Sequence, residues 1–114
     1  MRKVILLMLS FLFVLSFMNA YAHPPSDIKI EYDAETRIVS AVIVHPVSNI
    51  EQHFIKKVDV WLNGEEVIVH KISGQDNNHD QSTKYMIPDA KTGDTITIEA
   101  YCSMSGKLKK DIDL

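Results

Sequence analysis

The sequence predicts an all-β domain, an immunoglobulin-like sandwich of seven antiparallel strands, with an open barrel as the alternative architecture. Three observations support this class. No stretch beyond residue 22 has the apolar spacing of an amphipathic helix. Short runs rich in β-branched residues recur instead, separated by turn residues at intervals of about 8–12 positions. Asn63-Gly64 lies between two apolar runs and is typical of a two-residue hairpin turn, because both positions need positive φ.

The first four strands are defined by alternation and by the turns between them. Residues 28–32 alternate apolar and polar side chains, as a half-buried strand does, and 33–36 form a turn. Residues 37–44 are rich in Ile and Val, which favour strands. The third strand is 54–62, and the Asn-Gly turn leads from it directly into the fourth, 65–72.

The last three strands follow a polar loop at 73–81 that shows no periodicity. Residues 82–87 form a strand that ends at a proline, since proline cannot donate a hydrogen bond to the ladder. Residues 94–101 form the sixth strand on their alternating Ile and Thr. A tight turn at 103–106 then leads to the last strand, 107–114.

The third strand has one apolar and one mixed face. Its valines alternate with Lys57, Asp59 and Trp61, which therefore point away from the core. We expect Asp59 to be a solvated surface charge, as we do Glu65 and Glu66 near the hairpin. Trp61 either packs over the sandwich surface or contacts a partner, and both readings stay open.

The N-terminus has the pattern of a cleavable signal peptide. Arg2 and Lys3 precede the apolar run 4–17, and Ala20-Tyr21-Ala22 supplies the small-x-small cleavage pattern. The apolar run is shorter than the roughly 20 residues of a membrane-spanning helix, so we expect no stable membrane insertion after cleavage. We therefore predict a signal peptide at 1–22 and one domain at 23–114, exported to the periplasm or secreted.

The charge balance excludes several classes of partner. The net charge is −3, and loss of Arg2 and Lys3 with the signal peptide lowers it to −5. Nucleic acids and anionic membranes need a basic surface, so neither is expected as a partner. The four glycines are scattered, and no phosphate-binding glycine-rich loop is present in the sequence.

Four of the five histidines and the only cysteine are expected to share one end of the domain. If consecutive strands are antiparallel, alternation places His23, His45, His53, His79 and Cys102 at the same end. Imidazole and thiolate groups suit iron, copper, zinc or nickel. A lone thiol is otherwise a buried hydrophobe or the site of an intermolecular bond. The pattern therefore predicts a metal site.

Two segments carry a resemblance to a known family. The stretches HPVSNIEQHFIKKVDVWLNG (45–64) and AYCSMSG (100–106) resemble the ferrous-iron-binding domain of desulfoferrodoxin and superoxide reductase. The resemblance implies an immunoglobulin-like sandwich and one iron ion, Fe²⁺ or Fe³⁺, bound by four histidine nitrogens and an axial cysteine sulfur. On matching positions His45 and His53 are the central ligands, Cys102 is the axial ligand, and His23 is a looser match to the N-terminal one.

The implied activity is one-electron reduction of superoxide, with an electron-donor protein as partner. The sequence departs from the family at Ser105, which stands where the family has its remaining histidine. His79 is the only other loop histidine available as a replacement, although no motif supports it. The departure puts superoxide reduction in question, and no catalytic residue is assigned.

Two alternatives use the same residues differently. The pattern also resembles, more weakly, the Z-type subunit of the sulfur-oxidation carrier complex, a non-enzymatic sandwich that binds a carrier protein. In that reading Cys102 has no metal role. Alternatively, cleavage after Ala22 gives His23 a free α-amine beside its imidazole, and this pair suits copper.

Overall fold

The computed structural model describes residues 23–114. The predicted signal peptide at 1–22 lies outside the described residues. Within residues 23–114, no helix has the length and apolar character needed to cross a membrane.

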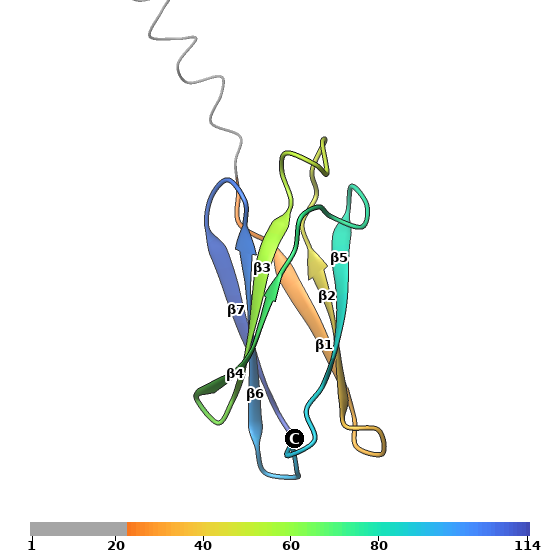
Figure 1. Cartoon of the computed structure of the whole chain (residues 1–114), viewed down its shortest axis with the longest axis vertical. Coiled ribbons are helices and arrows are strands. Elements are labelled where there is room, and N and C mark those ends of the chain that lie inside the picture. The colour runs from red at the N-terminus through yellow and green to blue at the C-terminus, as the bar shows by residue number, and fades with distance from the viewer. Residues whose placement is uncertain (1–22) are drawn as a thin grey trace, which may run out of the picture.

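Seven strands form two antiparallel sheets that face each other, which confirms the predicted sandwich (Figure 1). One sheet has the order β1-β2-β5 and the other β4-β3-β6-β7. Each strand begins and ends within two residues of its predicted limits; β5 starts earlier than expected because Asp80 pairs with Val44. The strands are β1 (Asp27–Asp33), β2 (Ile38–Val44), β3 (Ile55–Leu62), β4 (Glu65–Lys71), β5 (Asp80–Met86), β6 (Thr95–Cys102) and β7 (Lys107–Asp113).

The β3–β4 hairpin has the predicted turn. Asn63 has φ 52° and Gly64 has φ 82°, so both residues adopt the left-handed conformation that a type I′ turn requires. The side chain of Asn63 also ties the turn to β6, since its Nδ2 donates to Asp94 Oδ1 at 3.0 Å and its Oδ1 accepts from Thr95 N at 2.9 Å.

The core lies between the sheets and is built from the inward-facing residues of β1, β2, β3, β5 and β6. Removal of this apolar surface from water is the main favourable term in the folding of such a domain. The fully buried members with large side chains are Ile28, Val39, Ile43, Ile55, Val58, Val60, Ile96 and Ile98.

One prediction for β3 is wrong. Asp59 points away from the core as expected, yet it is only 2% exposed. Lys57 and Tyr101 lie over this part of the outer face and exclude water from the carboxylate. Glu65 and Glu66, at the edge of the same sheet, are exposed as expected.

One end of the sandwich gathers the segments that carry the predicted ligands. The N-terminal segment, the loop 45–54 after β2, the loop 72–79 and the β6–β7 turn all lie at the upper end in Figure 1. The turn packs closely on the N-terminal segment: a Cβ added to Gly106 would lie 2.8 Å from Pro24 Cβ. Gly106 also has φ 78°, so this position needs glycine both for space and for conformation.

Candidate metal centre

Three histidines from three separate segments meet at this end. His23 precedes β1, His45 directly follows β2, and His53 lies just before β3. One ligand atom from each lies within 4.8 Å of the other two, so the group can hold a metal ion. The ring centroids are 5.0 Å apart for His23 and His45, 5.0 Å for His23 and His53, and 4.7 Å for His45 and His53.

Backbone hydrogen bonds set the position of each histidine. His45 extends the β2–β5 pairing by one step, because its N–H donates to His79 O at 2.9 Å. His53 ends a turn in which its N–H donates to Asn49 O at 2.9 Å. The segment carrying His23 is held to the end of β2 by the bond from Ser26 N to Val44 O, 2.8 Å long.

Gln75 fixes the tautomer of His45. Its amide nitrogen donates to His45 O at 2.8 Å and to Asn77 O at 2.9 Å, which leaves the amide oxygen facing the imidazole. That oxygen lies 2.8 Å from His45 Nδ1, so Nδ1 must carry the proton. In the neutral ring the lone pair of His45 is therefore on Nε2, the other ring nitrogen.

The other ring nitrogen of His45, Nε2, lies 3.2 Å from the carbonyl oxygen of His23. This contact is a hydrogen bond only when the ring carries a proton on both nitrogens, because in the neutral ring Nε2 holds a lone pair that faces the carbonyl oxygen. His45 is 0% exposed, so water does not solvate this atom from outside. A cation in the cluster would satisfy the lone pair, and the donor set therefore fits a metal ion.

The electrostatics keep His53 ready to bind a metal. Desolvation, together with the neighbouring His45 and His23, lowers the pKa of His53 below its usual value of 6.5. The ring is thus neutral at neutral pH, and a neutral imidazole is the form that binds metals.

Cys102 meets the cluster through His53. Its sulfur lies 3.2 Å from His53 Nε2, and the residue is 3% exposed. Met104 N donates to the same sulfur at 3.4 Å. Cys102 stands outside the three-histidine group, so it is adjacent to that group and not among its members.

His23 is held by two backbone carbonyls. Its Nε2 lies 2.8 Å from Pro46 O and its Nδ1 lies 3.0 Å from Pro24 O. A neutral imidazole donates only one hydrogen bond, so one of these contacts is weak unless the ring is doubly protonated. Metal binding by His23 therefore requires one of the two contacts to break.

The other two histidines and Ser105 lie outside the cluster. His79 is exposed, and only its carbonyl approaches the cluster, through the bond from His45 N. His70 is on β4 and faces Tyr85 OH at 2.9 Å from its Nδ1. Ser105 is exposed in the β6–β7 turn. Sequence reasoning missed Gln75, because a glutamine within a polar loop has no pattern that distinguishes it.

The comparisons with known proteins add no relative. Neither the family models, nor the curated proteins, nor the solved structures contain a match to this chain. Among the described residues, the three-histidine cluster can hold a metal ion.

Proposed function

We propose that the protein is an exported binding protein for one transition-metal ion, iron in the first place, held by His23, His45, His53 and Cys102. The observation that carries the proposal is the cluster of three imidazoles, whose ligand atoms lie within 4.8 Å of one another and whose member His45 is fully buried. Three nitrogens and a thiolate form a donor set that suits iron, copper or zinc.

Each residue has a distinct part in this proposal. Gln75 holds His45 in the binding tautomer, as hydrogen-bond partners of metal ligands commonly do. His53 stays neutral and lies against the thiol, whose proton must leave before sulfur binds a metal. His23 closes the cluster when it releases a carbonyl.

The resemblance to superoxide reductases supports iron as the metal, and bound iron would supply one-electron redox chemistry. The chain offers three histidines where that family has four, and Ser105 is exposed at the position of the fourth. We therefore propose that the protein reduces superoxide slowly or not at all, and that binding or carrying the metal is its main activity.

Copper is the second candidate, and one observation favours it. The carbonyl of His23 lies 3.2 Å from His45 Nε2, so the backbone of His23 belongs to the immediate surroundings of the cluster. If cleavage follows Ala22, the new α-amine joins the same residue. Amine and imidazole together would then offer copper a chelating pair.

Metal analysis tests the proposal directly. The protein is purified anaerobically, and uptake of Fe²⁺, Cu²⁺ and Zn²⁺ is measured by titration and elemental analysis. We expect one equivalent to bind and His45→Ala to lose at least tenfold in affinity. His79→Ala is the matched control, because it removes an imidazole at the same end but outside the cluster. Absence of uptake for all three metals, or equal losses in the two variants, would end the proposal.

A further inference from the structure

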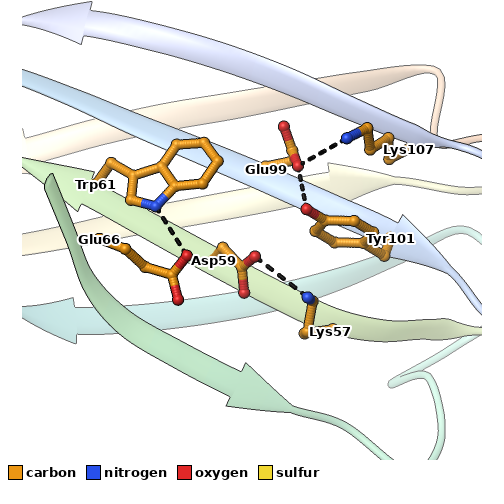
Figure 2. A network of polar contacts seen from close by, with 7 residues as sticks. All are labelled: Lys57, Asp59, Trp61, Glu66, Glu99, Tyr101 and Lys107. Carbon is orange, nitrogen blue, oxygen red and sulfur yellow. Dashed lines mark hydrogen bonds and ion pairs between the residues drawn. The ribbon is translucent and has the colours of Figure 1, made fainter. Parts of the chain in front are cut away.

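Two lysines flank the ring of Tyr101 on the outer face of the four-stranded sheet. Lys57 Nζ lies 4.2 Å from the ring centroid and Lys107 Nζ lies 5.5 Å from it. Buried carboxylates hold both ammonium groups, Asp59 at 3.3 Å from Lys57 and Glu99 at 3.3 Å from Lys107 (Figure 2). Since β6 lies between β3 and β7, the two cations stand on opposite sides of Tyr101.

This network is costly for stability on its own. Asp59 and Glu99 are direct cross-strand partners and are 2% and 4% exposed. Like charges opposite each other destabilise a sheet, and burial adds a desolvation penalty. Within residues 23–114, Asp59 Oδ1 has no hydrogen-bond partner. The two buried carboxylates hold the ammonium groups of Lys57 and Lys107 in fixed positions at the surface. Buried like charges that cost stability in this way are expected at binding sites.

Two surface depressions adjoin Tyr101 and share a wall made by Lys56 and Tyr101. One measures about 350 Å³ and continues along the turn 102–107 beside Cys102. The other measures about 480 Å³ and lies between Tyr101, Lys57 and Lys71. No carboxylate lines either depression. Lys56, Lys57, Lys71, Lys107 and Tyr101 are together called the Tyr101 face below.

The Tyr101 face is basic although the protein is acidic. The chain has a net charge of −3, yet four of its lysines gather here. Asp59 and Glu99 offset Lys57 and Lys107, so the four lysines and two carboxylates leave a charge of 4 − 2 = +2, carried by Lys56 and Lys71. Lys56 and Lys71 are exposed and form no ion pair within the described part of the chain. A positive patch on an acidic protein attracts a negative partner while the rest of the surface repels it, which orients the approach.

We propose that the Tyr101 face docks a carboxylate-rich segment of a partner protein, next to Cys102. An extended segment fits better than a single small anion because the cations come from β3, β4 and the start of β7, and because Lys56 and Tyr101 line both depressions. Carboxylates along the segment pair with Lys56 and Lys71, and the preset ammonium groups of Lys57 and Lys107 lose little freedom on binding.

The test is a titration of metal-free, ¹⁵N-labelled protein with a hexaglutamate peptide at low salt, followed by NMR. We expect amide shifts confined to the Tyr101 face and to 103–107, and an affinity that falls steeply as salt is added. The double variant K56E/K71E should bind at least tenfold more weakly. Both lysines are exposed, so the changes leave the core intact, and K56Q/K71Q provides a second variant without charge reversal.

A matched control has the same charge change on the other sheet. Lys29 and Lys84 are exposed on β1 and β5, so K29E/K84E alters net charge equally. We expect it to weaken binding less than threefold. Equal weakening by both double variants would reduce the effect to net charge and overturn the proposal. Identical amide shifts with sodium sulfate would also overturn it, because they would indicate a site for small anions. The absence of localised amide shifts at millimolar peptide would overturn it as well. Because the protein is metal-free, the outcome is independent of the metal site.

Discussion

The hydrogen bond from His45 to Gln75 gives the sharpest test of the metal centre. Gln75 is 4% exposed and makes three hydrogen bonds, one to the ring of His45 and two to carbonyls. Gln75→Leu removes all of them, so His45 is free to exchange its proton between Nδ1 and Nε2. Loss of a partner of this kind typically lowers metal affinity about 10–100-fold, or about 1.4–2.7 kcal/mol.

The stability cost of Gln75→Leu must be separated from its effect on binding. Unpaired buried groups cost about 1–3 kcal/mol each, and the variant leaves His45 O and Asn77 O without the amide donor. Gln81→Leu is the matched control, since Gln81 is 6% exposed, accepts from Asp76 N and donates to Ser82 O without touching an imidazole. It should unfold at lower denaturant while keeping the metal affinity.

Two measurements complete the test. Competition with a chromophoric chelator gives the Zn²⁺ affinity, and ¹⁵N NMR of the metal-free protein reports which nitrogen of His45 carries the proton. We expect Nδ1–H in the natural protein and a mixture in Gln75→Leu. Gln75→Glu, whose carboxylate is a stronger acceptor, should keep the Nδ1–H tautomer. A folded Gln75→Leu protein that binds Zn²⁺ as tightly as the natural one would refute the reasoning.

Four further predictions concern single residues. The pKa of His53 in the folded protein is below 6.5, so the unfolded chain takes up a proton at this residue first as the pH falls. The contribution of His53 to the stability of the metal-free protein should therefore be fully present above about pH 6.5 and decline below it. Denaturation midpoints that do not respond to His53→Gln between pH 7 and 5 would contradict this. Cys102→Ser should abolish the visible charge-transfer band of the ferric protein; an unchanged band, with stability lower by about 1–3 kcal/mol, would mean that Cys102 is only a core residue. Ser105→His should raise Fe²⁺ affinity at least tenfold in anaerobic titration, whereas rapid superoxide turnover by the natural protein would show that no ligand is missing. The hydrogen bond from Tyr101 OH to Glu99 and, after it, burial of the ring raise the pKa of Tyr101 above 10. Ultraviolet titration should show this phenol ionising last among the tyrosines, and Tyr101→Phe should remove that late step. The contribution of Tyr101 to stability should be present below about pH 10 and lost as the pH rises further.

Strand direction was predictable from the sequence, and it gave the location of the three-histidine cluster. Alternation and turn residues define seven strands, and their antiparallel order determines which loops share an end. His23, His45 and His53 therefore could be placed together without coordinates. His79 satisfied the same rule and yet lies outside the cluster, because strand order decides the end but not how deeply each loop folds over it.

Residues whose role depends on neighbours across the fold could not be predicted. Gln75 acts only through its position beside His45, thirty residues earlier in the chain. Asp59 has the sequence context of a surface charge, and it is buried by long side chains from its own strand and from β6. For Asp59 the period of the strand gives the direction of the side chain, whereas its surroundings depend on which strands become neighbours. Gln75 lies in a loop without periodicity, so the sequence gives neither its direction nor its surroundings.

The three-histidine cluster also has a consequence for the covalent topology of the chain. The protein has one cysteine, so no disulfide can close a loop within it. An ion shared by His23 and His53 would cross-link positions about 30 residues apart, and constraining the unfolded chain by such a link is worth about 3–4 kcal/mol in the loop-entropy model. The ion would thus be a reversible cross-link between the N-terminal segment and the sandwich. A chelator would remove this cross-link, just as a reductant breaks a disulfide.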